Sequence, residues 1–332
     1  MTEDEIQKLE EINEIDQILE YIAPFYPDLK VKKKTIVEIE KALYNTYIKI
    51  LGKILIYSPE NMRLFLRAFL LKYEIMNIKQ IISGSIVGLS LSERRKNVNF
   101  LVEEYLENTE FIRQLLEIYS LDEIVYFMRD TRYNKVVREG ILYFKNNNEI
   151  FVLDAFLDRL YYRNLVNIKQ KLNKKEFKMI SLFIDYQTEI YNLNTLYRGS
   201  KNGIEEKLLR QFLVENYLFF TNDDFEFLLT HRSEAEFLSR VEQKLNEVED
   251  MKNVYLSKGI DRKDLIRSLE KLYQNLYFFR FKEKIDDIEF MTIYRILEVI
   301  IKKNGEIKFE ILPKVVDILH SHYSKLEDYI KK

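Results

Sequence analysis

Residues 189–203 read Glu-Ile-Tyr-Asn-Leu-Asn-Thr-Leu-Tyr-Arg-Gly-Ser-Lys-Asn-Gly, and a related stretch occurs at residues 74–88, which read Glu-Ile-Met-Asn-Ile-Lys-Gln-Ile-Ile-Ser-Gly-Ser-Ile-Val-Gly. The Glu-Ile pair, the Asn and both Gly residues of residues 189–203 lie 115 positions after their counterparts in residues 74–88. The whole chain has only 8 Gly residues, so the shared spacing points to an internal repeat.

Each copy predicts a helix, because its Ile and Leu residues recur at helical spacing. The polar pairs are Glu74 with Asn77 and Glu189 with Asn192; each pair has i, i+3 spacing and so shares one helix face. The first Gly of each Gly pair is expected to end its helix in the left-handed conformation. A copy is therefore a helix with an apolar stripe, one polar pair and a glycine stop.

A second, shorter pattern predicts three copies of the whole plan. An acidic–basic–apolar–apolar run begins at Glu40, Asp158 and Glu270, before the two full copies and before a further Glu-Ile pair at Glu306. This third copy is degenerate, because Phe309 stands where the others have Asn. The phase of the two patterns together indicates a threefold repeat.

The composition favours an all-α protein. With 8 Gly and 4 Pro, turn residues are too scarce for a sheet with many hairpins, and 32% charged with 47% hydrophobic residues suits amphipathic helices. We expect three similar helical bundles, at residues 1–98, 99–205 and 206–332, the third being divergent.

Local signals place the boundaries of these elements. The polar stretch 90–97 is expected to be a loop between the first two bundles. Capping boxes are predicted at Ser120 with Glu123 and at Ser233 with Glu236, each opening a helix.

Bulk properties exclude several classes of function. The 52 basic residues against 54 acidic ones argue against binding of nucleic acid. The absence of Cys excludes disulfides, thiol nucleophiles and thiolate metal sites, and fits a cytoplasmic location. No run of about 18 uncharged apolar residues occurs, so we expect no direct membrane span.

One acidic cluster suggests an enzyme as an alternative. Residues 223–226, Asp-Asp-Phe-Glu, have the spacing of the magnesium site in a helical terpene cyclase. An enzyme of that type needs a second carboxylate cluster, and none has suitable spacing. Following Asn222, the acidic residues are more simply interpreted as capping a helix. We therefore expect no catalytic residue, metal or cofactor.

The repeated polar pairs have two interpretations. Glu74 with Asn77 and Glu189 with Asn192 can bridge helices within each bundle, as buried polar groups must be hydrogen-bonded, or can contact a partner. We favour the first. Arg198 can likewise bond an exposed helix carbonyl or a partner carboxylate, and the sequence leaves both open.

The repeated stretches also carry a resemblance to a known family. Residues 72–82 (Lys-Tyr-Glu-Ile-Met-Asn-Ile-Lys-Gln-Ile-Ile), residues 185–199 (from Asp-Tyr-Gln-Thr-Glu-Ile to Tyr-Arg-Gly) and residues 157–162 (Leu-Asp-Arg-Leu-Tyr-Tyr) carry it. The sequence resembles the C subunit of archaeal-type (A/V-type) rotary ATP synthases, the counterpart of the d subunit of the vacuolar ATPase. The third copy departs from the family pattern, which usually has a fuller motif there.

The resemblance implies both a fold and a function. It implies three helical bundles around a pseudo-threefold axis, forming a funnel that sits on the membrane rotor ring of proteolipid subunits and receives the central shaft of the ATPase head. One copy per complex would transmit torque, without chemistry of its own, during proton or sodium transport. The protein would be cytoplasmic and peripheral to the membrane. A generic helical-repeat scaffold is a further alternative.

Overall fold

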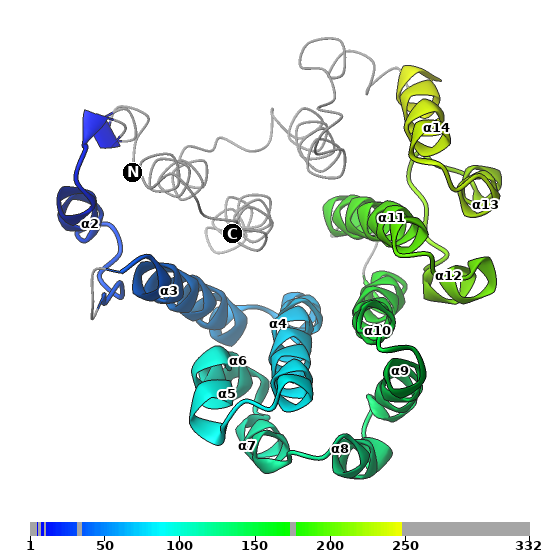
Figure 1. Cartoon of the computed structure of the whole chain (residues 1–332). Coiled ribbons are helices and arrows are strands. Elements are labelled where there is room, and N and C mark those ends of the chain that lie inside the picture. Colours follow the sequence, from blue (N-terminus) through cyan, green and yellow to red (C-terminus); the bar gives the residue numbers. More distant parts are fainter. Residues whose placement is uncertain (1–4, 6–7, 10, 32–34, 173–176, 248–332) are drawn as a thin grey trace. The chain divides into compact units, whose positions relative to one another are not determined.

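The computed structural model describes residues 5–247, except 6–7, 10, 32–34 and 173–176. Within these residues the chain forms helices α2 to α14 and one short 3-10 helix, η1, and contains no strand (Figure 1). The prediction of an all-α fold is confirmed. The third copy expected at Glu306, and Glu270 before it, lie outside the described residues.

The chain divides into two compact units, residues 1–50 with 274–332 and residues 51–273. In the described part of the first unit, α2 (Ile15–Ile22) buries Ile18 and Ile22 against Leu9, with Leu43 of α3 (Ile36–Tyr57) packed on them. The division into three bundles stays a prediction.

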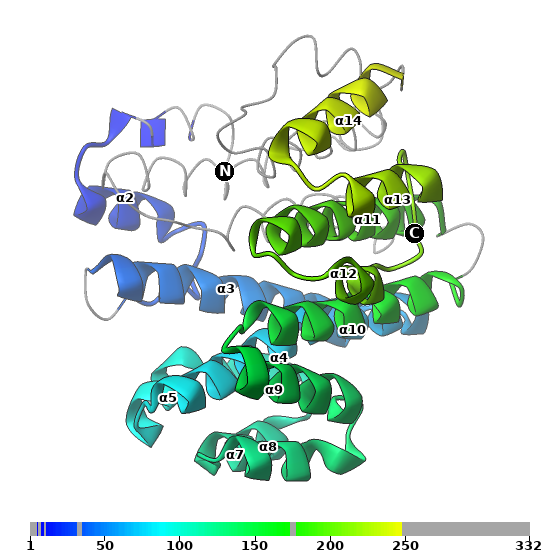
Figure 2. The ribbon, with the colours of Figure 1, turned by 45° about the vertical axis from the view of Figure 1, so that its right-hand side comes forward.

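Helix α10 (Phe151–Lys169) is the centre of the second unit. It contacts α4 (Glu60–Val87), α9 (Asn134–Asn147) and α11 (Phe177–Lys201) (Figures 1 and 2). A helix covered on several sides must be apolar on several faces. The sequence of α10 meets that need, with these residues buried: Phe151, Val152, Leu153, Ala155, Phe156, Leu157, Tyr161, Leu165 and Ile168.

The long helices α4 and α11 each lead into a set of short helices. After α4 come α5 (Leu91–Asn97), α6 (Phe100–Leu106), α7 (Thr109–Glu117), α8 (Leu121–Phe127) and η1 (Met128–Asp130). After α11 come α12 (Glu206–Phe212), α13 (Asn222–Thr230) and α14 (Glu234–Glu247). Helices α5 and α12 begin and end 115 positions apart, so the sequence repeat is also a repeat of local structure.

The prediction for the glycines was wrong in one respect. Gly84 and Gly199, the first of each pair, lie inside α4 and α11. The second of each pair, Gly88 (φ 77°) and Gly203 (φ 69°), adopts the left-handed conformation at the helix end. In both copies the amide after the second Gly donates to the carbonyl of the first, over 2.8 and 2.9 Å, which is the Schellman arrangement.

The first Gly of each pair instead permits a close approach of the following short helix. A Cβ atom on Gly84 would lie 2.7 Å from Cγ of Arg94, and one on Gly199 would lie 2.1 Å from Cδ2 of Leu209. Both distances are shorter than any real van der Waals contact. These positions therefore require Gly for space, and not for an unusual backbone angle.

Two other local predictions need correction, and one is confirmed. Residues 90–97 are not a loop, because Ser90 and Glu93 form a capping box that starts α5, with Ser90 N donating to Glu93 Oε2 over 2.9 Å. Ser120 precedes α8 as predicted, but its side chain makes no capping hydrogen bond. Ser233 does cap α14, accepting a 3.2 Å hydrogen bond from the amide three residues on.

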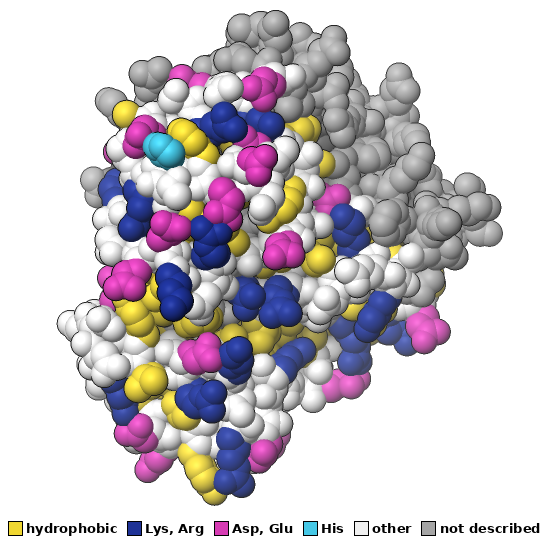
Figure 3. All heavy atoms as spheres, turned by 90° about the vertical axis from the view of Figure 1, so that its right-hand side faces the viewer, with side chains coloured by type: hydrophobic (Ala, Val, Ile, Leu, Met, Phe, Trp, Pro, Cys, Tyr) yellow, Lys and Arg dark blue, Asp and Glu magenta, His cyan; other side chains and the backbone are white. Residues whose placement is uncertain are grey.

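The surface around α9 to α14 has no dominant charge. Figure 3 shows Lys and Arg side chains interspersed with Asp and Glu on the face turned to the viewer. Among the described residues, no helix is both long and apolar enough to cross a bilayer.

Candidate functional site

Two asparagines act as matched clamps on the backbone. Asn77 donates from Nδ2 to the carbonyl of Asn99 over 3.0 Å and accepts from the amide of Asn99 over 2.8 Å. Asn192 makes the same pair of bonds with Val214, over 2.8 and 2.9 Å. An amide side chain has both a donor and an acceptor, so it can satisfy both polar groups of one residue. Each clamp ties a long helix to the segment that follows its short helix.

The glutamates of the two repeated pairs, Glu74 and Glu189, are both buried and are satisfied in different ways. In the second copy, Oε2 of Glu189 accepts hydrogen bonds from three successive backbone amides, those of Leu218, Phe219 and Phe220, over 2.6, 2.9 and 3.1 Å. Successive amides turned to one side form a concave anion site. This carboxylate thus organises the chain between α12 and α13.

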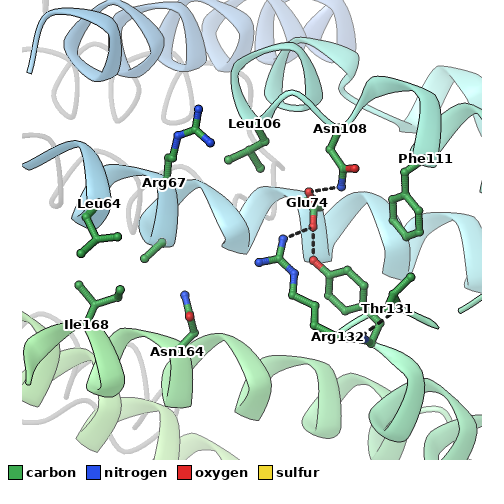
Figure 4. A pocket seen from close by; sticks show the side chains of 12 residues that line it. Leu64, Arg67, Glu74, Leu106, Asn108, Phe111, Thr131, Arg132, Asn164 and Ile168 are labelled. Atoms are coloured by element: carbon green, nitrogen blue, oxygen red, sulfur yellow. Dashed lines mark hydrogen bonds and ion pairs between the residues drawn. The ribbon is translucent and has the colours of Figure 1, made fainter. Parts of the chain in front are cut away.

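In the first copy, side chains take the place of backbone amides. Glu74 accepts hydrogen bonds from Asn108 Nδ2 and Arg132 Nη2, each over 2.7 Å, and from the hydroxyl of Tyr133 (Figure 4). The donors come from the α6–α7 turn and from the segment between η1 and α9. Burial and the charge of Glu74 raise the pKa of Tyr133 well above its usual value, so its hydroxyl stays a donor.

A second buried carboxyl group, Glu103 of α6, belongs to the same cluster. Its Oε1 accepts a hydrogen bond from Asn77 Nδ2 over 2.6 Å, and its side chain is fully buried. Burial first, and then the negative charge of Glu74, raise the pKa of Glu103 to about 8. The raised pKa favours the protonated, uncharged form of Glu103.

The Glu74 cluster lies at the wall of a pocket of about 580 Å³ (Figure 4). Arg132 binds the buried carboxylate of Glu74 and also lines this pocket. Its side chain is 53% exposed, whereas that of Glu74 is 1% exposed. Asn164 of α10 points into the pocket from the opposite side. The lining residues are Leu64, Arg67, Ala68, Glu74, Leu106, Asn108, Phe111, Thr131, Arg132, Tyr133, Asn164 and Ile168.

Arg198, the remaining candidate residue, is exposed near the end of α11. Its guanidinium carbon lies 5.3 Å from the centre of the Phe151 ring, and its positive charge acts on the Asp154 carboxyl of α10. Whether Arg198 also meets a partner carboxylate stays a prediction.

The acidic cluster at the start of α13 is built into the fold. Thr221, and not Asn222, is the N-cap residue, and it forms a capping box with Asp224. Asp224 also makes ion pairs with Arg240 Nη2 over 2.5 Å and Lys244 Nζ over 3.1 Å. Burial alone would raise the pKa of Asp224, but hydrogen bonds from Thr221 and Lys244 lower it overall.

Glu226, a second acidic side chain of this stretch, is also paired. Glu226 is bound by Arg210, which holds Glu206 as well over 2.9 Å. In the part of the chain that the structure describes, no group of three or more His, Asp or Glu side chains is arranged to hold a metal ion. The spacing of residues 223–226 thus reflects capping and ion pairing between helices.

Comparison with known proteins places the chain in a family context. A sequence model of the family described as ATP synthase (C/AC39) subunit matches residues 1–308. Similar curated proteins include the C subunit of the A-type ATP synthase of Methanocaldococcus jannaschii, 25% identical over 54% of this chain and 44% of the relative. The same subunit of Methanococcoides burtonii is 24% identical over 68% and 59% of the two chains, respectively. The chain spans about half the length of the curated relatives it matches.

Proposed function

Because the chain belongs to the ATP synthase (C/AC39) subunit family, we propose that it is a non-catalytic subunit of the central stalk of an A/V-type rotary ATPase or ATP synthase. In this role it is a socket that couples the central shaft of the ATPase head to the proteolipid ring in the membrane. It sits on the cytoplasmic side, peripheral to the membrane, and serves transport of protons or sodium ions.

The observation that carries this proposal, beyond the family match, is the use made of the buried polar residues. Both Asn clamps and the Glu189 carboxylate bind the chain's own backbone. These bonds fix the segments that follow the long helices α4 and α11. A part that transmits torque needs such rigid joints, whereas a catalytic site would direct its polar groups at a substrate.

The enzyme alternative has no comparable support. Two of its three proposed metal ligands already pair with cationic side chains, Asp224 with Arg240 and Lys244, and Glu226 with Arg210. A metal ion would have to displace these charge-assisted bonds.

The proposal is tested by purifying the native complex through a tag on this chain. We expect the shaft subunits and the proteolipid to co-purify. In membrane vesicles stripped of this chain, we expect ATP hydrolysis by the head to persist while ATP-driven ion transport is lost, and re-addition of the chain to restore transport. A rotary complex that contains shaft and ring but lacks this chain, with transport intact, would overturn the proposal.

A further inference from the structure

Arg94 of α5 is a fully buried cation whose donors are only partly used. Its Nη1 donates to Ser85 Oγ over 2.9 Å and to the carbonyl of Ile118 over 2.6 Å, and the ring of Tyr119 covers the guanidinium at 4.0 Å. Its Nε and Nη2 atoms are buried and have no hydrogen-bond acceptor among the described residues. No carboxylate of the described residues forms an ion pair with it. A buried charge without a counter-charge is costly to maintain.

The second copy shows that packing does not require an arginine here. The residue 115 positions after Arg94 is Leu209, which is also fully buried. Gly84 makes room for the stem of Arg94, as Gly199 does for Leu209. Because Leu fills the same place in the same local fold, the guanidinium of the first copy serves something other than packing.

The two copies also differ in the polarity of the exposed residues where the long helix meets the short helix that follows it. Val87, Leu91 and Tyr119 are 73%, 37% and 54% exposed. Val87 ends α4, Leu91 begins α5 and Tyr119 lies two residues after the end of α7, and these three helices contact one another. The counterparts of Val87 and Leu91 in the second copy are Asn202 and Glu206. The second copy thus has polar residues at these two positions and a buried Leu, whereas the first has exposed apolar residues and a buried cation.

We propose that Val87, Leu91 and Tyr119, together with the buried Arg94, form a docking surface for a protein segment that presents one acidic side chain among apolar ones. A partner carboxylate supplies the acceptor that Nε and Nη2 of Arg94 lack, in a charge-assisted bond. The apolar rim covers that bond, as neighbouring contacts do around the centre of an interface. Tyr119 is half exposed and lies outside the helices, so its ring is the group that we expect to move when the carboxylate binds.

The proposal rests on the proposed function only in taking the partner to be another subunit of the same complex. It is tested with a photo-crosslinking amino acid at Val87 in the full chain, within the native complex. We expect a crosslink to a segment that contains Asp or Glu next to apolar residues. A crosslink to lipid, a crosslink to a segment without Asp or Glu, or no crosslink in the assembled complex would overturn the docking surface.

Substitutions with the residues of the second copy give the matching binding test. Arg94→Leu should keep the thermal stability of the isolated chain and weaken its binding to the partner by about tenfold or more, because a charged pair is lost. Val87→Asn, on the exposed rim, should weaken binding without affecting folding, and covers the case in which Arg94→Leu fails to fold. The control Asn202→Val in the second copy should leave binding unchanged.

The reciprocal variant completes the test. Neutralising the crosslinked acidic residue to Asn or Gln should weaken binding of the wild-type chain and not weaken binding of Arg94→Leu further. Equal losses in both would overturn the pairing with Arg94. If the chain fails to enter a rotary complex but this reciprocal loss holds with another protein, the docking surface stands and the proposed function falls. If the chain assembles into a rotary complex and Val87 gives no crosslink, the proposed function stands and the docking surface falls.

Discussion

Glu103 is a carboxyl group that folding removes from water and places beside the carboxylate of Glu74. Because its folded pKa is about 8 against an ordinary 4.5, the folded state holds a proton that the unfolded state releases between these values. Its contribution to the free energy of unfolding is therefore complete below about pH 4.5 and is lost as pH rises to about 8. We expect urea unfolding from pH 5 to 9 to show this decline.

The variant Glu103→Gln isolates this effect. Gln keeps an acceptor for Asn77 but cannot ionise, so the decline in stability with pH should largely disappear. Glu104→Gln, at the exposed neighbouring position, should keep the wild-type decline. If both variants retained the wild-type pH dependence, the proton would not be held by Glu103.

Asn192 is expected to stabilise the isolated chain. Asn192→Ala leaves the amide and carbonyl of Val214 without their partners in a buried position, and each unsatisfied group costs about 1–3 kcal/mol. We expect urea denaturation to show a loss of about 2 kcal/mol or more. Asn194→Ala, at a half-buried site on the same helix, should cost far less. An unchanged unfolding curve with lost partner binding would make Asn192 an interface residue.

Asp224 carries more than a helix cap. Its side chain is 1% exposed and pairs with Arg240 and Lys244, so Asp224→Ala removes the ion pair of Arg240 and leaves Lys244 with Glu247 alone. Because Arg240 is 27% exposed, we expect a loss of up to about 3 kcal/mol, the low end of the cost of breaking a buried pair. Asp223→Ala, at an exposed position on the same helix, should cost at most about 1 kcal/mol. Thermal unfolding of the two variants provides the comparison, and equal losses would contradict the role of the ion pairs.

At the scale of elements, replacing either of the two glycines at the end of α11 by Ala should lower stability, for a different reason at each position. Gly199→Ala drives a methyl group into Leu209, and such overpacking costs about 1–3 kcal/mol. Gly203→Ala meets no atom within 4 Å but strains a residue with φ of 69°, at a cost of about 1–2 kcal/mol.

A double-mutant cycle separates the two causes. Adding Leu209→Ala should recover part of the loss caused by Gly199→Ala and none of the loss caused by Gly203→Ala, because only the first arises from contact with Leu209. Strictly additive losses in the first pair, measured by urea denaturation, would show that α12 moves aside without strain.

The sequence predicts elements better than it predicts their partners. Periodicity and spacing identified α4, α11 and their duplication, since these features are local. The role of Gly84 could not be read, because steric need depends on Arg94, which packs there only after folding. Glu103 has no signal either, since the residue 115 positions later is Leu218, whose backbone amide serves Glu189 instead. The repeat in the sequence gives no information about contacts that occur in only one of the two copies.

At the scale of the whole molecule, the threefold plan stays a prediction, because most of its third part lies outside the described residues. We expect residues 206–332 to complete a third bundle whose helices superimpose on those of the first two. A solved structure of the complex, with the three segments compared pairwise, measures this directly. A third segment packed in an unrelated way would limit the repeat to two copies.

The paired hydrogen bonds of Asn77 and Asn192 have a mechanical consequence. A turn held only by its glycine would bend easily under load, because few hydrogen bonds oppose rotation there. Each clamp adds a second point of attachment beyond the short helix, so turn, short helix and long helix resist bending as one braced corner. A twist applied at one end of such a corner is passed to the other end with little local bending.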